Sequence, residues 1–194
     1  MSQNSQNQGR EVAQRVFATE FNDSTHTFRE ADDEMAPVYA LLPTGQKSNR
    51  VFLIGTLTET NNVGDQEEYW QGRIVDPTGT VFVYAGQYQP EAEEFLRGAN
   101  PPTFVAVTGK PRTYETDDGN VNVSLRPEYI SVVDESTRHR WISETASQTL
   151  DRIEKLDNES NPYVQMAGEQ YDGDVDRYRQ AVITALESLE ETNN

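Results

Sequence analysis

The amino-acid sequence predicts a mainly β protein: a five-stranded barrel between an N-terminal helical arm and a C-terminal helical extension. The central residues are rich in β-branched and aromatic types, interrupted by turn signals. The regions on either side instead place apolar residues at helical spacing. A chain of 194 residues has room for one barrel with extensions. We therefore expect a leader, helix and arm over residues 1–48, the barrel over 49–134 and the helical extension over 135–194.

The N-terminal region opens with ten polar residues and continues with an expected amphipathic helix over residues 10–21. The apolar residues of this helix recur on one face: Val12, Val16, Phe17 and Phe21. A polar stretch follows over residues 22–34. The apolar run 38–42, closed by Pro43-Thr44-Gly45, predicts a strand or an extended segment docked on the barrel.

The centre of the chain predicts five strands, over residues 50–60, 69–75, 80–85, 103–113 and 121–133. Asp76-Pro77-Thr78-Gly79 is a tight-turn signal before the third strand, and Asp117-Asp118-Gly119-Asn120 is another before the fifth. Pro127 inside the fifth strand predicts an edge position or a bulge, because proline donates no ladder hydrogen bond.

A short helix is expected between the third and fourth strands, over residues 90–97. Pro90 opens it, acidic residues fill its first turn and Gly98 follows it. Three strands, one helix and two further strands are the order of the OB-fold, a five-stranded barrel. Gly55 suits the sharp bend of the first strand in such a barrel. The alternative is another small β-barrel or a β-sandwich. The helix expected between the third and fourth strands favours the OB-fold over both.

The last third of the chain predicts two helices. Residues 136–156 place apolar side chains on one side: Trp141, Ile142, Ala146, Leu150 and Ile153. Residues 174–191, with Asp174 as the expected N-cap, carry a second apolar stripe. We expect this stripe to bind a partner protein through Val175, Tyr178, Val182, Leu186 and Leu189.

The composition is strongly acidic, with 33 Asp and Glu against 16 Lys and Arg and a net charge of −17. Disorder, a cation-binding role and adaptation to molar salt each produce such a balance. The acids are spread along the chain and only three basic residues are lysine, which favours a salt-adapted surface. No apolar run exceeds five residues and the polar opening lacks a signal-peptide core, so we expect a soluble, cytoplasmic protein.

Sequence motifs for catalysis or metal binding are not found. The absence of cysteine excludes disulfides, thiolate zinc sites and cysteine nucleophiles. Residues 172–176 resemble the start of a calcium loop, but Arg177 and Ile183 stand where that loop needs Gly and Glu. His26 and His139 have no nucleophile motif near them. We therefore expect the protein not to be an enzyme and to bind no cofactor or metal. A catalytic pair of carboxylates brought together only by folding is the alternative that the sequence leaves open.

Strand parity predicts an aromatic and basic outer face on the barrel. If Val81 and Val83 point inward, Phe82 and Tyr84 point outward on the third strand. If Trp70 and Ile74 point inward on the second strand, Tyr69 and Arg73 also point outward. Three more residues begin the loop between strands four and five. The candidate contacts for single-stranded DNA are Tyr69, Arg73, Phe82, Tyr84, Lys110, Arg112 and Tyr114.

Two observations argue against the prediction of a DNA-binding face. The arm or the C-terminal helices could cover these aromatic residues and make them a secondary core. The barrel residues 50–133 also carry 12 acids against 6 bases, which repels phosphates at ordinary salt. In molar salt the Debye length falls to about 3 Å, so stacking would contribute more than charge.

Several segments of the chain resemble the haloarchaeal replication protein A-associated family. They are RVFLIGTLTE (50–59), GRIVDPTGT (72–80), VYAGQYQP (83–90), FVAVTGKP (104–111) and SLRPE (124–128), with residues 140–141 and 144–146. The resemblance covers about residues 10–156. It implies an OB-fold accessory subunit that works beside a larger, replication protein A-like subunit on single-stranded DNA in replication and repair, near the nucleoid. It supplies no catalytic residues. A structural subunit with little DNA binding of its own is the alternative, and a nuclease is a distant third.

Overall fold

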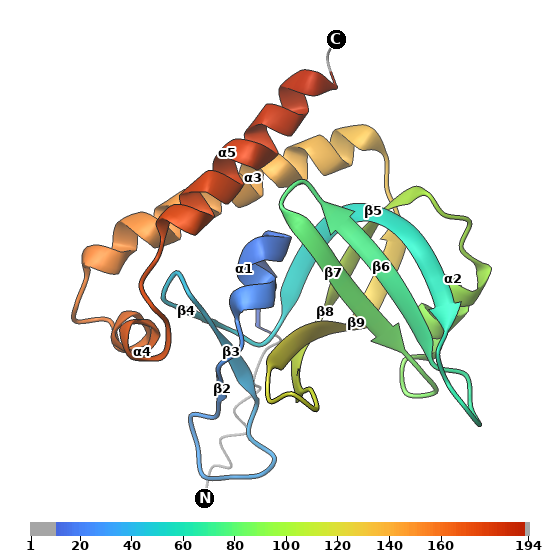
Figure 1. Ribbon diagram of the computed structural model, residues 1–194, viewed down its shortest axis with the longest axis horizontal. Helices are drawn as coiled ribbons and strands as arrows, with labels where there is room; N and C mark the ends of the chain where they lie inside the picture. Colours follow the sequence, from blue (N-terminus) through green and yellow to red (C-terminus); the bar gives the residue numbers. More distant parts are fainter. Residues whose placement is uncertain (1–10, 193–194) are drawn as a thin grey trace, which may run out of the picture.

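The computed structural model describes residues 11–192 (Figure 1). Its elements in chain order are β1 (Gln14–Arg15), α1 (Ala18–Asp23), β2 (Thr27–Phe28), β3 (Tyr39–Leu42), β4 (Gln46–Ser48), β5 (Val51–Asn62), β6 (Trp70–Asp76), β7 (Gly79–Ala85), α2 (Pro90–Gly98), β8 (Thr103–Glu115), β9 (Val121–Val132), α3 (Glu135–Glu154), a 3₁₀ helix (Lys155–Asp157), α4 (Pro162–Gln170) and α5 (Asp176–Glu191). The chain is mainly β at its centre and helical towards its C-terminal end.

Five strands form a closed barrel in the order β5-β6-β7-β9-β8, and pairing of β5 with β8 completes it. This order and the helix α2 between β7 and β8 confirm the five-stranded barrel that the sequence predicts. The long strand β5 pairs with β8 over residues 51–57 and with β6 over 56–62. Gly55 lies where those pairings meet. A Cβ atom there would be 2.7 Å from the carbonyl oxygen of Val75, so only glycine fits this bend.

Pro127 lies at a β-bulge, as expected. Thr108 pairs with Tyr129 while the next residue, Gly109, pairs with Pro127, so β9 contains one extra residue at this point. Beyond the bulge, β8 and β9 continue as a hairpin, and Leu125 of β9 also pairs with Val83 of β7. An extra residue in one strand changes which of its side chains share a face with those of its partner beyond the bulge.

The barrel interior confirms most of the predicted strand parity. Val81, Val83 and Ile74 are fully buried, whereas Trp70 is only half-buried. Helix α2 packs against β5, β6, β7 and β9 and buries Leu96 in the core.

The prediction of a helix over residues 10–21 is wrong for the first part of that range. Arg10 lies outside the described residues, and Gln14–Arg15 form β1, which pairs in parallel with β5. The Gln14 N–H donates to the carbonyl of Arg50 at 2.9 Å, so tertiary pairing replaces helical hydrogen bonds. Helix α1 starts only at Ala18, whose N–H donates to Asp76 Oδ2 at 2.7 Å. That distant carboxylate caps the helix, and no local sequence pattern reveals it.

The strand expected in residues 38–42 is confirmed as β3. It lies between β2 and β4 in a three-stranded antiparallel sheet beside the barrel (Figure 1). The Lys47 ammonium on β4 lies 4.5 Å from the Tyr39 ring centroid and 3.0 Å from the Glu30 carboxylate. Burial is the largest single effect on the pKa of Lys47 and lowers it, but hydrogen bonding to Glu30 and Tyr163 together with nearby charge outweighs it, so the pKa is raised overall. This arrangement holds the small sheet against α4.

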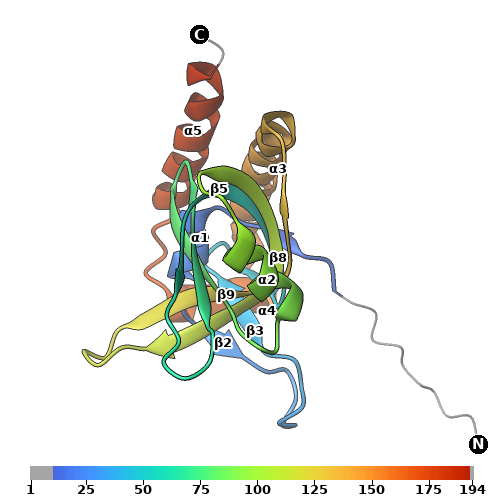
Figure 2. The same ribbon diagram turned by 90° about the vertical axis from the view of Figure 1, so that its right-hand side faces the viewer.

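Helices α3 and α5 lie side by side along one side of the barrel (Figures 1 and 2). Helix α3 begins after Asp134, whose side chain accepts from the Thr137 N–H at 2.9 Å. Helix α4 was not expected from the sequence. The expected N-cap at Asp174 is wrong, because α5 begins at Asp176 and no side chain caps it. None of the helices described combines the length and apolar character that crossing a bilayer requires.

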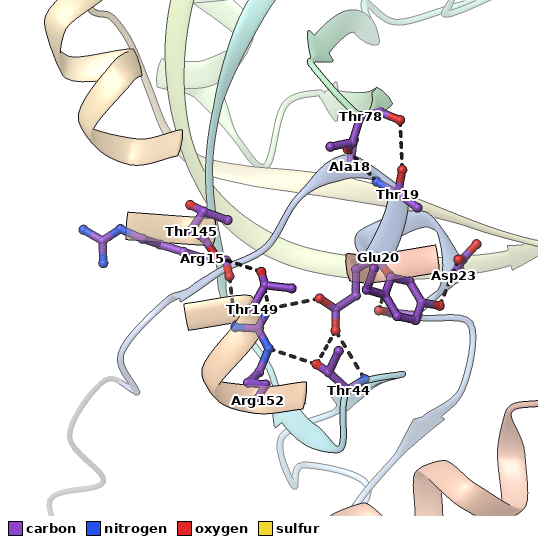
Figure 3. Close-up of polar contacts among 12 residues, drawn as sticks. Arg15, Ala18, Thr19, Glu20, Asp23, Thr44, Thr78, Thr145, Thr149 and Arg152 are labelled. Atoms are coloured by element: carbon purple, nitrogen blue, oxygen red, sulfur yellow. Dashed lines mark hydrogen bonds and ion pairs between the residues drawn. The ribbon is translucent and has the colours of Figure 1, made fainter. Parts of the chain in front are cut away.

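A buried ion pair joins the arm to α3 (Figure 3). Arg152 Nη2 lies 3.0 Å from Glu20 Oε2, and both side chains are almost inaccessible to solvent. Thr44, in the turn between β3 and β4, accepts from Arg152 Nε at 2.9 Å and donates to Glu20. Three segments far apart in the sequence are therefore fixed together by one polar network.

The hydrophobic core is continuous across the three expected regions. Phe21 and Leu42 of the arm and Trp141 and Val182 of the C-terminal helices belong to the same buried cluster as the barrel interior. The division at residues 48 and 134 stays a prediction, but the arm and helices share their buried surface with the barrel.

Candidate nucleic-acid interface

A hollow of about 560 Å³ lies between the β8–β9 hairpin and the region where β6 begins and β7 ends, including the connection from β7 to α2. We call it the tyrosine hollow. Four tyrosines and two arginines line it: Tyr69, Tyr84, Tyr88, Tyr114, Arg112 and Arg126. The other lining residues are uncharged. On a chain with 33 acids, the lining of this hollow contains no carboxylate among the described residues.

Tyr69 and Tyr84 form a stacked pair at the floor of the tyrosine hollow. Their ring centroids are 5.7 Å apart and the rings are inclined by 18°. Gln71 Nε2 donates to the Tyr84 hydroxyl at 2.8 Å, which fixes this ring on its strand. Burial raises the pKa of Tyr84, so the phenol stays neutral near neutral pH. Tyr69 is 45% exposed and leaves an aromatic edge open to solvent.

The hairpin presents cations towards the same side. Lys110 lies directly opposite Arg126, and Arg112 lies opposite Ser124 on the same face. Lys110, Arg112 and Arg126 form no ion pair among residues 11–192. Many other described bases are paired: the guanidinium of Arg50 binds Glu128 at 2.8 Å, and that of Arg177 binds Asp23 at 2.7 Å. These three cations therefore have no ion-pair partner within residues 11–192, although the hairpin as a whole also carries four acids, Glu115, Asp117, Asp118 and Glu128.

The structure brings four of the seven predicted contact residues together. Tyr69, Tyr84, Arg112 and Tyr114 all line the tyrosine hollow. Lys110 lines a neighbouring hollow at the foot of the hairpin.

The other two lie elsewhere on the barrel. Arg73 and Phe82 are directly opposite each other on β6 and β7, further along the outer face. Arg73 donates to Thr58 Oγ1 at 3.0 Å, so its guanidinium is already held by the barrel.

Sequence reasoning missed Tyr88 and Arg126. Counting residues back from the turn at 117–120 places Arg126 opposite Lys110, so strand pairing could have identified it. Tyr88 lies in the connection between β7 and α2, where no periodicity constrains the direction of a side chain. The arm and the C-terminal helices contribute no described residue to the lining of the tyrosine hollow. The alternative, in which the arm or the C-terminal helices cover the aromatic residues, therefore does not hold for the residues that line this hollow.

The predicted partner-binding stripe on α5 is divided by the fold. Tyr178 and Val182 are buried within the chain, and the Tyr178 hydroxyl donates to Asp23 Oδ2 at 2.9 Å. These two residues are inaccessible to a partner, which corrects their assignment. Val175 and Leu189 are half-buried, and Leu189 packs against the core. Leu186 is 40% exposed and the neighbouring Ile183, which was not predicted, is 48% exposed.

Within residues 11–192, no three or more His, Asp or Glu side chains are grouped so that they could hold a metal ion. The acidic run 172–176 comprises the loop before α5 and the first residue of that helix. Asp23, Tyr171 and Tyr178 border a separate polar hollow beside this loop. The hydroxyl of Tyr171 donates there to the Leu41 carbonyl at 2.6 Å. Those groups are engaged in structural hydrogen bonds.

No protein-family model matches the chain, and no curated protein matches it. Among solved structures, it is similar to a chain from the S. pombe Stn1-ten1 complex, with a TM-score of 0.61 and 11% identity. That match covers 76% of this chain and 98% of the other. The chain has an OB-fold.

Two single-stranded-DNA-binding proteins are also similar to parts of this OB-fold chain. S. cerevisiae mitochondrial Rim1 is 18% identical over 44% of this chain and 94% of its own, with a TM-score of 0.36. A small protein from Mycoplasma pneumoniae is 16% identical over 45% of this chain and 93% of its own, with a TM-score of 0.34.

Proposed function

We propose that this OB-fold chain is a single-stranded-DNA-binding accessory subunit. The tyrosine hollow is the observation that carries the proposal. Among residues 11–192, its lining combines stacked aromatic rings with arginines that form no ion pair and contains no carboxylate, although the chain as a whole has a charge of −17. Aromatic rings beside cations are what a groove for single-stranded nucleic acid requires.

Bases stack on Tyr69, Tyr84 and Tyr114 in this proposal, and Lys110 and Arg112 contact the phosphate backbone. Arg73 and Phe82 extend the contact surface along β6 and β7. Stacking contributes about 1–3 kcal/mol per base and survives high salt, whereas counterion release contributes little there. Affinity in molar salt would therefore depend mainly on the tyrosines.

The partner in this proposal is a larger, replication protein A-like protein, and the shared duty is DNA replication and repair. The segments that resemble the haloarchaeal replication protein A-associated family support it, as does the OB-fold itself. The S. pombe structure with a similar fold is likewise of a complex. The spread acidic charge supports a salt-adapted, nucleoid-associated location in a halophilic archaeon.

Fluorescence anisotropy of a labelled oligonucleotide in molar KCl tests the proposal, with the chain alone and with its larger partner. We expect binding that weakens by about 1–3 kcal/mol in the Tyr84→Ala variant. Tyr163→Ala is the matched control, because Tyr163 is also a half-buried tyrosine but lies beside Lys47, away from the tyrosine hollow. No binding by the chain alone, together with unchanged affinity of the Tyr84→Ala complex, would refute the proposal.

A structural subunit with little DNA binding of its own is the second candidate. The exposed pair Ile183 and Leu186 on α5 favours it, because adjacent apolar side chains on a helix suit a protein contact. Leu186→Glu should leave the thermal midpoint nearly unchanged and abolish co-purification with the larger subunit. If co-purification persists in this variant and in Ile183→Glu, α5 is not the contact.

A further inference from the structure

A second hollow, of about 580 Å³, adjoins the tyrosine hollow at the start of α2. We call it the α2 hollow. Tyr88, Gln89 and Arg126 line both hollows, so the two are continuous along these side chains. Lys110 and Glu91 line the α2 hollow and not the tyrosine hollow.

Tyr88 forms the ridge between the two hollows. Its side chain is 84% exposed, which is unusual for so large an apolar ring. The backbone around it is held in place, since the Gln89 N–H donates to the Gly86 carbonyl at 2.9 Å. The Gln89 side chain in turn accepts from the Gly86 N–H at 3.2 Å. Because the turn is already hydrogen-bonded, stacking of a base on the ring has to order the Tyr88 side chain but not its backbone.

Lys110 and Arg126 lie opposite each other across the hairpin beside this ring. Like charges directly opposite in a sheet destabilise it unless an anion is shared between them. Two acids also line the α2 hollow, but Glu128 is held by Arg50 through contacts of 2.8 and 3.0 Å. Glu91 is the remaining acid of this lining, and its side chain is exposed.

We propose that single-stranded DNA bound in the tyrosine hollow continues over Tyr88 into the α2 hollow. The next base stacks on the Tyr88 ring, and its phosphate lies between Lys110 and Arg126. This inference rests on the proposed function and extends it. It adds a second nucleotide site and a path for the DNA from the tyrosine hollow to the α2 hollow.

Tryptophan fluorescence reports the stacking directly. Tyr88→Trp is titrated with an oligothymidylate of about 16 nucleotides, the upper end of OB-fold site sizes. Stacking of a base should quench the added tryptophan. Met35→Trp is the matched control: Met35 is 88% exposed but lies between β2 and β3. Tyr88→Ala should weaken binding of the same oligonucleotide about fivefold, as expected for one stacked base.

A charge substitution reports the α2 hollow separately. Glu91→Gln removes a negative charge from its lining and should tighten binding about twofold at low salt, where charges are least screened. Glu94→Gln is the control, because Glu94 is exposed on the same helix but does not line either hollow.

The outcomes separate this inference from the proposed function. Quenching in Tyr88→Trp above the Met35→Trp control, with tighter binding by Glu91→Gln alone, supports the extended path. If Tyr84→Ala weakens binding but the fluorescence of Tyr88→Trp is not quenched, or the two glutamate variants behave alike, the extended path is refuted and the proposed function stands. If the unaltered chain binds no oligonucleotide alone or with its partner, both fail.

Discussion

Replacing Arg152 by methionine should destabilise the protein strongly. The guanidinium donates to Glu20 at 3.0 Å, to Thr44 at 2.9 Å and to the Arg15 carbonyl at 3.3 Å (Figure 3). Methionine fills a similar volume but leaves Glu20 Oε2 without the donor that compensates its burial. Removing one partner of a buried pair costs about 3–5 kcal/mol, because an unpaired charge stays in the interior.

This loss is large enough to measure in two ways. A chain of this length shifts its thermal midpoint by about 2–4 °C per kcal/mol, so Arg152→Met should lower the midpoint by about 6–20 °C. Guanidinium-induced unfolding followed by circular dichroism gives the free energy of unfolding directly. The loss should be similar at low and high KCl, because solvent ions do not screen a buried pair.

Two further variants isolate the pair. Lys155→Met removes an exposed ion pair of 2.8 Å with Asp151 at the C-terminal end of α3 and should change stability little. The double variant Glu20→Leu/Arg152→Met should be more stable than the sum of its single variants by up to about 3 kcal/mol, because no charge is then left unpaired. If Arg152→Met is no more destabilising than Lys155→Met, the Glu20–Arg152 ion pair does not stabilise the packing of the arm against α3.

Three other outcomes are expected. Gly55→Ala should lower the free energy of unfolding by about 1–3 kcal/mol, because its Cβ would meet the Val75 carbonyl; a smaller loss means that β5 can relax. Burial raises the pKa of Tyr171 to about 12. The folded state therefore keeps a proton that the unfolded state loses near pH 10, so stability should fall as the pH rises through this range. Tyr171→Phe should reduce this alkaline loss in pH-dependent unfolding, and an unchanged slope contradicts the assignment. Three unpaired cations predict a slope of about −2 for log affinity against log salt, and Arg112→Gln should bring it closer to zero by about 0.7. An unchanged slope in a salt titration would remove Arg112 from the interface.

Much of the barrel could be predicted because its signals are local. The turn at residues 76–79 and the alternation around Val81 and Val83 fix the register of β6 and β7, since side chains alternate with a period of two. The same parity placed Tyr69 and Tyr84 on one outer face. It could not show that the hairpin approaches that face, because the curvature comes from barrel closure and the bulge at Gly109.

The structure of the N-terminal segment could not be predicted, because it depends on contacts with distant residues. Val12, Val16 and Phe17 have helical spacing, yet the backbone around Gln14 pairs with β5 and Val12 is exposed. The start of α1 depends on Asp76, which lies 58 residues away in the sequence. The apolar stripe of α5 was identified correctly as a stripe, but its spacing alone could not distinguish a partner from the chain's own core.

The sequence by itself determined the strand order, the helix between the third and fourth strands and the acidic, cysteine-free composition, because these depend on neighbours in the chain. The tertiary structure decided where the tyrosines and cations meet, which apolar faces are buried and how the arm is held. Each of those features depends on atoms from distant segments. The excess of acids is a property of the whole sequence, whereas only the folded barrel gathers Tyr84, Arg112 and Arg126 around a hollow to which the described part of the chain contributes no carboxylate.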